Sequence, residues 1–150
     1  MKSRTFTMIK PDAVAAGNTG KILDRMETEG FTIRAMRLVF MSRNQAAQFY
    51  AIHTGQPFFE QLVCFMTSGA AVVAVLEREG NDAVKALRAL AGHTNPAEAQ
   101  PGTLRAEFGG GLPDNAVHAS DSDENARIEW SHFFAPGDII DLDYAPLRDP

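Results

Sequence analysis

Apolar residues that alternate with polar ones, or that run without interruption, predict four strands in this chain. Residues 4–9 form an extended run that ends at about Lys10, because the residue before a proline avoids helical geometry. Residues 31–41 alternate closely enough to predict a longer strand that is partly covered on both faces. The Val- and Ala-rich residues 69–77 predict a buried third strand, and residues 116–119 predict a short fourth one.

Apolar residues spaced at one helical turn predict the helices between these strands. The first helix lies between Gly17 and Gly30, where Asn18 is suited to cap its start. Gly30 suits the left-handed conformation that commonly ends a helix. The other helices are expected at residues 42–51, 57–67 and 81–91, and from Ser122 through Trp130.

The element order βαββαβ is that of a ferredoxin-like α+β sandwich. We expect a four-stranded antiparallel sheet with helices on one face, an inserted helical hairpin broken at Gly55 and a long loop before the last strand. Pro57 fits the first turn of the second hairpin helix. The loop, residues 92–114, is rich in Gly and Pro and is predicted to hold little regular structure, and the tail from Pro136 is expected to wrap the surface. Nothing divides the chain by composition, so residues 1–150 are interpreted as a single domain.

Composition and charge narrow the possible partners. The 150 residues are 45% hydrophobic and 22% charged, close to the globular average. A formal net charge of −5 provides no overall attraction to nucleic acid or an anionic membrane, so any phosphate-bearing ligand must be held by local chemistry. Cys64 is the single cysteine, the first residues hold no long apolar signal region, and the longest apolar run is far too short to span a bilayer. We therefore expect a cytoplasmic protein with no membrane partner and no specific nucleic acid partner.

The sequence matches no complete motif for a protein-bound metal or for a nucleotide-binding loop. Residues 17–22 resemble a P-loop, but only two residues separate the glycines and Ile22 stands where Ser or Thr would bind magnesium. The four histidines are scattered, and the aspartates at 138, 141 and 143 lack the glycine and glutamate of a calcium loop. No metal site made of protein ligands is expected.

His118 is the strongest candidate for chemistry. It ends a short predicted strand, Ala119 and Ser120 leave room beside its ring, and Glu129 in the following helix is placed to orient the imidazole. An oriented neutral imidazole is a competent nucleophile or base near neutral pH. The alternative is a structural histidine whose hydrogen bonds are satisfied.

Cationic and aromatic residues suggest a site for a phosphate-bearing ligand. Lys10, Arg88 and Arg105 come from a strand end, a helix and the long loop, which can meet around an anion, although ordinary solvated charges are the alternative. Neutral donors are available from Thr94 and Asn115. In the hairpin, core packing is the better interpretation of Phe59, Leu62 and Phe65, while one ring of the Phe58–Phe59 pair must point outward. An exposed ring there would stack on a base of any identity.

Five segments in the same order resemble the nucleoside diphosphate kinases. They are residues 4–12 (RTFTMIKPD), 56–59 (QPFF), 92–96 (GHTNP), 100–105 (QPGTLR) and 115–122 (NAVHASDS). The resemblance implies a ping-pong reaction in which His118 takes the γ-phosphate of a nucleoside triphosphate and passes it to a nucleoside diphosphate. It also implies a magnesium ion held mainly by the nucleotide phosphates and water, and a homo-oligomer, a tetramer or hexamer, built from dimers that pack sheet edge to sheet edge.

The same resemblance assigns roles to individual residues. Glu129 and Ser120 resemble the shell that orients His118, Phe58 resembles the base-stacking ring, and Leu62 is its apolar neighbour. The residues that resemble the phosphate and sugar ligands are Lys10, Tyr50, Arg88, Thr94, Arg105 and Asn115. The chain departs from the family pattern at Ala13, Gln56, His93 and Ala119.

Two other functions are compatible with such a chain. One is an inactive family member that serves as a nucleotide-binding or scaffold module, against which the presence of His118, Lys10, Arg105 and Glu129 argues. The other is a ferredoxin-like sensor or nucleic-acid-binding domain. That function requires a basic sheet face with exposed aromatic residues, which the acidic composition and the predicted strands do not offer.

Overall fold

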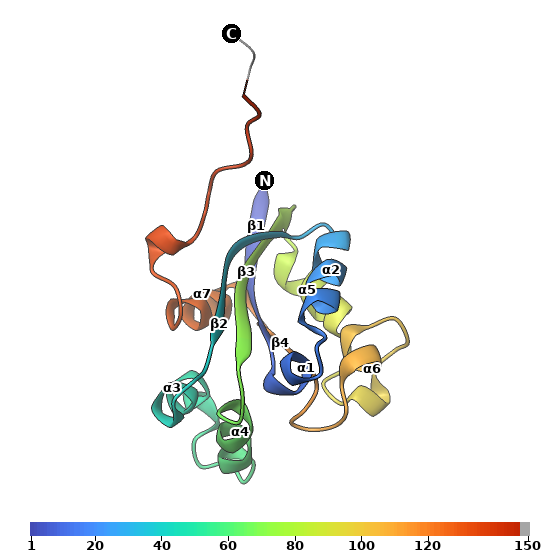
Figure 1. Ribbon diagram of the computed structural model, residues 1–150, viewed down its shortest axis with the longest axis vertical. Coiled ribbons are helices and arrows are strands. Elements are labelled where there is room, and N and C mark those ends of the chain that lie inside the picture. Colours follow the sequence, from blue (N-terminus) through green and yellow to red (C-terminus); the bar gives the residue numbers. More distant parts are fainter. Residues whose placement is uncertain (148–150) are drawn as a thin grey trace.

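A computed structural model describes residues 1–147 and contains a four-stranded antiparallel sheet (Figure 1). Its strands are β1 (Lys2–Ile9), β2 (Thr32–Val39), β3 (Ala71–Glu79) and β4 (Val117–Ala119), in the spatial order β2-β3-β1-β4. The central strand β1 pairs with β3 through Phe6 and Val75 and with β4 through Met8 and His118. The predicted ferredoxin-like fold class is confirmed, and β3 continues two residues beyond its expected end.

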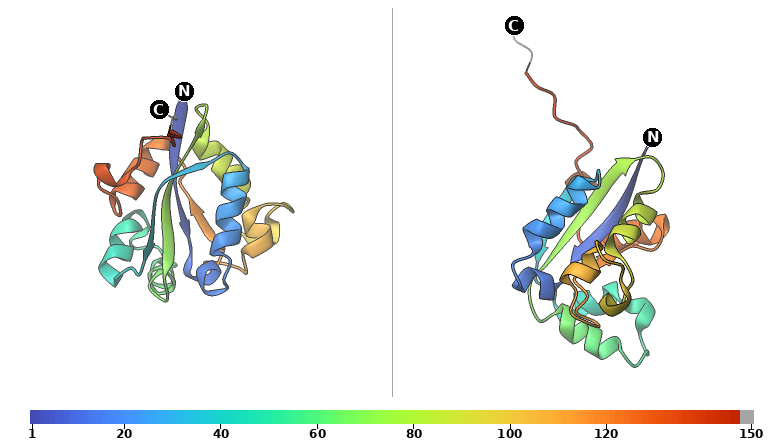
Figure 2. Two further views of the ribbon diagram at one scale, coloured as in Figure 1. Left: turned by 45° about the horizontal axis from the view of Figure 1, so that its top comes forward. Right: turned by 90° about the vertical axis from the view of Figure 1, so that its right-hand side faces the viewer.

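Helices cover both faces of the sheet, which corrects the expectation that they lie on one face (Figures 1 and 2). The helices are α1 (Pro11–Ala15), α2 (Thr19–Thr28), α3 (Arg43–Phe49), α4 (Phe59–Met66), α5 (Ala83–Ala91), α6 (Leu104–Phe108) and α7 (Asp123–Ser131). Short 3-10 turns follow at η1 (Ala51–His53), η2 (Pro96–Glu98) and η3 (Pro136–Asp138). Within residues 1–147, no helix is long and apolar enough to cross a membrane.

Two hydrophobic cores explain this arrangement. One joins Ile9 of β1 to α2 and α5, and the other joins Phe6 and Met8 of the same strand to α4 and to Phe134 beyond α7. Because successive side chains of a strand point to opposite faces, a strand that is apolar at consecutive positions needs cover on both sides. The hairpin and α7 supply that second cover.

The remaining differences from the predicted elements are local. The helices α1 and α6 were not predicted, and α6 and η2 lie inside the segment expected to be irregular. Pro57 precedes Phe58, the N-cap of α4, rather than lying in its first turn. Asn18 is the N-cap of α2 as predicted, but its side chain makes no capping hydrogen bond. Gly30 has a φ of +90°, as the predicted left-handed exit requires.

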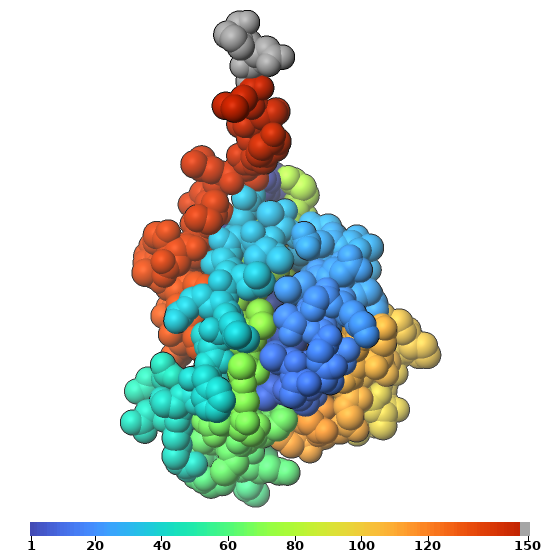
Figure 3. Space-filling view, viewed as in Figure 1, coloured from blue at the N-terminus to red at the C-terminus, as the bar shows by residue number. Residues whose placement is uncertain are grey.

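The tail wraps the surface only as far as Asp143. Ile140 N donates to Arg34 O at 2.8 Å, and the Arg34 guanidinium binds Asp143 at 2.7 Å. Arg4 also pairs with Asp141. Beyond these contacts the chain runs away from the body (Figures 1 and 3), so the prediction is wrong for residues 144–147. Residues 148–150 lie outside the described part of the chain.

Candidate active site

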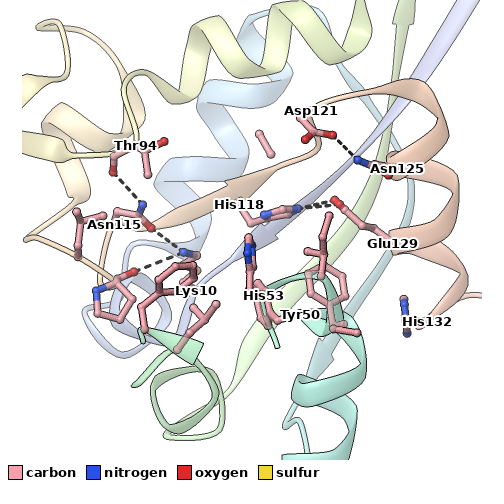
Figure 4. Close-up of a pocket in the computed structure, with 18 of the residues that line it drawn as sticks. Lys10, Tyr50, His53, Thr94, Asn115, His118, Asp121, Asn125, Glu129 and His132 are labelled. Carbon is pink, nitrogen blue, oxygen red and sulfur yellow. Dashed lines mark hydrogen bonds and ion pairs between the residues drawn. The ribbon is translucent and has the colours of Figure 1, made fainter. Parts of the chain in front are cut away.

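One cavity of about 850 Å³ gathers residues from both ends of the chain (Figure 4). Its wall is built by the end of β1, the hairpin of α3 and α4, the helix α5, the segment before β4, and α7. Ten of the predicted site residues line it, namely Lys10, Tyr50, Phe58, Leu62, Arg88, Thr94, Arg105, Asn115, His118 and Glu129. Residues that lie more than 100 positions apart therefore meet at one site, as predicted.

His118 is held by a carboxylate through one ring nitrogen. Its Nε2 lies 2.6 Å from Oε1 and 3.0 Å from Oε2 of Glu129. Because an ionised carboxylate only accepts hydrogen bonds, Nε2 carries the proton and Nδ1 carries the free lone pair. Nδ1 has no hydrogen-bond partner in the described part of the chain. The contact with Glu129 therefore engages Nε2 and leaves Nδ1 as the ring nitrogen available to a ligand.

Ser120 supports this arrangement from behind. Its hydroxyl donates to Oε1 of Glu129 at 3.0 Å, and its side chain is fully buried. It does not line the cavity. Ser120 thus holds the Glu129 carboxylate in place, and that carboxylate in turn orients His118. Ser120 itself is not placed to contact a ligand directly.

Aromatic rings restrict the plane of the His118 imidazole. Phe49 meets it edge-on, with ring centroids 5.5 Å apart and an interplanar angle of 80°, and Phe6 lies at 6.1 Å. Phe49 was not predicted as a site residue. Its place in a helix with ordinary apolar spacing gave no reason to separate it from the core.

Lys10 is a buried cation whose bonds go to neutral groups. Only 7% of the residue is exposed, and Nζ donates to Asn115 Oδ1 at 2.7 Å and to Pro113 O at 3.4 Å. Asn115 in turn donates through Nδ2 to Thr94 O at 2.9 Å. Burial, together with the charge of Arg105, lowers the pKa of Lys10 to about 8. No carboxylate forms an ion pair with this ammonium group within residues 1–147.

Two arginines complete the cationic wall. Arg105 donates to Gly92 O at 2.8 Å and to Val117 O at 2.9 Å, while its buried Nε has no partner in the described residues. Burial and the neighbouring Arg88 lower the pKa of Arg105 to about 10. Arg88 donates to Ala119 O at 3.2 Å. Fixed cations that share a cavity repel one another, and an anionic ligand relieves that repulsion.

The hairpin supplies an apolar end to the cavity. Phe58 is 46% exposed whereas Phe59 packs against the core, so the predicted outward ring is Phe58. Leu112 is 56% exposed and also lines the cavity. The ring of His53 lies edge-on to Phe58, with centroids 5.2 Å apart. Leu112 and His53 are not among the predicted site residues, although the position of His53 between Tyr50 and Phe58 indicates the same end of the cavity.

Tyr50 brings an unused donor to the cavity. Its residue is 6% exposed, and its hydroxyl has no hydrogen-bond partner among residues 1–147. Burial, together with the nearby charge of Glu129, raises the pKa of Tyr50 well above its usual value. The hydroxyl therefore stays protonated and keeps an unused donor.

The departures from the family pattern leave the cavity intact. Among residues 1–147, Ala116 is the one non-glycine residue with positive φ, so the methyl group of Ala119 adds no backbone strain. His93 and Gln56 do not line the cavity. His93 Nδ1 instead accepts from the Asn95 backbone N–H at 3.0 Å.

Comparison with known proteins identifies the family. A family model described as nucleoside diphosphate kinase matches residues 3–139. The chain belongs to the nucleoside diphosphate kinase family. A protein of Campylobacter jejuni named nucleoside diphosphate kinase is 54% identical over 136 residues, which are 91% of this chain and 98% of that protein.

Solved structures of the family agree with this fold. An Aquifex aeolicus nucleoside diphosphate kinase superposes with a TM-score of 0.89 and 43% identity, covering 93% of this chain and all of that one. A Halobacterium salinarum nucleoside diphosphate kinase in complex with CDP gives a TM-score of 0.90 at 36% identity, covering 96% and 95% of the two chains. The family resemblance of the five sequence segments is thereby confirmed, and membership supports nucleotide phosphotransfer as the activity.

Proposed function

We propose that this chain is a nucleoside diphosphate kinase that transfers the γ-phosphate of a nucleoside triphosphate to a nucleoside diphosphate through His118. The observation that carries this proposal is the state of the imidazole. Glu129 occupies Nε2, while Nδ1 faces a cavity lined by Lys10, Arg88 and Arg105. A nucleophile beside cations that lack counter-ions is suited to an anionic electrophile.

The covalent step follows from this geometry. The lone pair of Nδ1 attacks the γ-phosphorus, the bond from phosphorus to the bridging oxygen breaks, and the nucleoside diphosphate leaves with that electron pair. The phosphorylated ring then carries a positive charge, which the Glu129 carboxylate balances through Nε2–H. A second nucleoside diphosphate attacks the phosphohistidine in the reverse sense, so the reaction is ping-pong.

The other cavity residues bind the nucleotide and stabilise the negative charge of its phosphates. Phosphoryl transfer asks mainly for positioning and charge neutralisation, which Lys10, Arg88 and Arg105 supply. Neutral donors for phosphate and sugar oxygens are Tyr50, Thr94 and Asn115. Phe58 stacks on the base with Leu62 as its apolar neighbour. Because a stacked ring contacts a π-face and reads no base edge, nucleotides of different bases are accepted.

Magnesium enters with the nucleotide as part of the substrate. Within residues 1–147 no three His, Cys, Asp or Glu side chains gather in an arrangement that could hold a metal ion. The cavity instead presents cations, which fit the phosphate oxygens of a Mg²⁺–nucleotide complex. Mg²⁺ ordinarily keeps several waters and is bound through substrate phosphates.

The active form is a homo-oligomer, a tetramer or hexamer built from dimers. The sheet edge β2 exposes Met36 at 50% and Leu38 at 68%, and Phe40, one residue beyond the strand, is exposed at 67%. An edge strand with an exposed apolar row invites pairing with a second copy. We infer a cytoplasmic enzyme, formed as one unit by residues 1–150, without a membrane partner or a specific nucleic acid partner.

Labelling with γ-labelled ATP and Mg²⁺ tests the proposal. Wild-type protein takes up label that is labile to acid and stable to base, and GDP removes it, whereas His118→Ala stays unlabelled. His93→Ala, outside the cavity, is the matched control and labels like wild type. Equal labelling of His118→Ala contradicts the mechanism. A wild-type protein that binds ADP but takes up no label is instead the inactive scaffold module.

A further inference from the structure

The segment before His118 contains a strained turn. Ala116 has a φ of +71°, and among residues 1–147 it is the one residue other than glycine with positive φ. Val117 N donates to Asn115 O at 2.9 Å, which closes a γ-turn with Ala116 at its centre. The form with positive φ is rare and strained, and such strain persists only where the surroundings hold it.

Both backbone groups of Ala116 are held by one short segment at the junction of β1 and α1. Lys10 N donates to Ala116 O at 2.8 Å. Ala116 N donates to Oδ2 of Asp12 at 3.1 Å. Ala116 is fully buried, so water does not provide substitute partners. The carboxylate of Asp12 is therefore the side chain that clamps this turn.

The turn lies between two residues of the cavity. Asn115 precedes it and bonds to Lys10 and Thr94, while His118 follows two residues after it and bonds to Glu129. We propose that Asp12 is a positioning residue for phosphoryl transfer, because its carboxylate holds the γ-turn that aims both Asn115 and Nδ1 of His118 into the same cavity. This inference rests on the proposed function of His118.

A simpler interpretation is that Asp12 only stabilises the start of α1. Acidic residues are favourable in the first turn of a helix. However, α1 spans only five residues, and the bond of Asp12 reaches Ala116, 104 positions away in the sequence. The two interpretations predict different effects of relieving the strain at Ala116. Only if Asp12 holds the γ-turn does the loss of its carboxylate matter less once that strain is gone.

A double-mutant cycle in the full chain separates them. The readout is the single-turnover rate at which His118 is phosphorylated. We expect Asp12→Ala to slow this step by about tenfold to a hundredfold, since small displacements of reacting groups have such effects. Asp12→Asn keeps an acceptor oxygen and stays within about threefold of wild type. Glycine adopts positive φ without strain, so in the Ala116→Gly background Asp12→Ala slows the step by less than about threefold.

Ala126→Gly provides the matched background. Ala126 is also fully buried, but it lies in the helix α7 without positive φ, so Asp12→Ala must there keep its full effect. Circular dichroism and urea unfolding establish that each variant is folded. The inference is overturned if Asp12→Ala reacts like wild type, slows both glycine backgrounds equally, or unfolds the chain in both. A wild-type protein that is never phosphorylated refutes the proposed function instead.

Discussion

Nε2 of His118 lies 2.6 Å from Oε1 of Glu129, and this contact leaves Nδ1 as the nitrogen that faces the cavity. The imidazole is thereby held in one tautomer before a nucleotide arrives. In the proposed reaction, the same carboxylate would balance the charge that the ring gains on phosphorylation.

Glu129→Gln removes the carboxylate while keeping the size of the side chain. We expect kcat/KM to fall by a factor that corresponds to about 1.5–3 kcal/mol, the usual contribution of a hydrogen bond to a charged group. Glu124→Gln on the same helix is the matched control, because Glu124 is exposed and outside the cavity. Steady-state kinetics with ATP and GDP measure both variants. An unchanged kcat/KM for Glu129→Gln argues against the role of this pair.

Arg105→Ala weakens both the reaction and the fold. Loss of a preorganised cation is expected to reduce transition-state stabilisation by about 2–4 kcal/mol. The carbonyls of Gly92 and Val117 also lose their donor, so the free energy of unfolding falls. Kinetics and urea unfolding measure the two effects separately, with the exposed Arg127→Ala as control. If folded Arg105→Ala protein turns over at the wild-type rate, Arg105 does not contribute to catalysis.

Nucleotide affinity depends on pH through Lys10. Burial favours the neutral amine and lowers its pKa to about 8, whereas a phosphate binds the charged form. Above that pH the group must be reprotonated on binding, so the Kd for Mg–ADP rises about tenfold between pH 7 and pH 9. Calorimetric titrations measure this change. Lys10→Arg flattens the profile and the exposed Lys21→Arg does not, while a flat wild-type profile contradicts the prediction.

Phe58→Ala removes the stacking surface at the exposed end of the cavity. Stacking of a base on an aromatic ring contributes about 1–3 kcal/mol, so KM rises to a corresponding extent for purine and pyrimidine nucleotides alike. Tyr144→Ala, which truncates an exposed ring outside the cavity, leaves KM unchanged. A loss confined to one base would show that Phe58 takes part in base selection.

Leu38→Asp tests the assembly. A carboxylate in the apolar row of β2 is expected to dissociate the dimers, because a buried unpaired charge is strongly unfavourable. Light scattering measures the molar mass, and Ile52→Asp, also exposed but in η1 rather than β2, serves as control. If Leu38→Asp keeps the wild-type mass, the sheet edge is not the interface.

Much of the fold was predictable because long elements carry a clear hydrophobic period. Regions with such a period, as in α2, α5 and β2, were found close to their observed bounds. The helices α1 and α6 were missed since five residues are too few to display a helical period. The second layer of helices was missed for another reason. Residues 4–9 predict a short strand, but their consecutive apolar side chains also require cover on both faces of the sheet.

The sequence by itself determined the order of elements, the family and most of the residues that meet in the cavity, because these depend on local periodicity and on residue identity. The tertiary structure decided how those residues act. It selected Phe58 over Phe59 as the exposed ring, left the Tyr50 hydroxyl without a partner and set the tautomer of His118 through Glu129. It also placed positive φ at Ala116, where no glycine marks it. Such features arise from contacts between distant segments, and local sequence does not encode a conformation that Lys10 and Asp12 impose from more than 100 residues away.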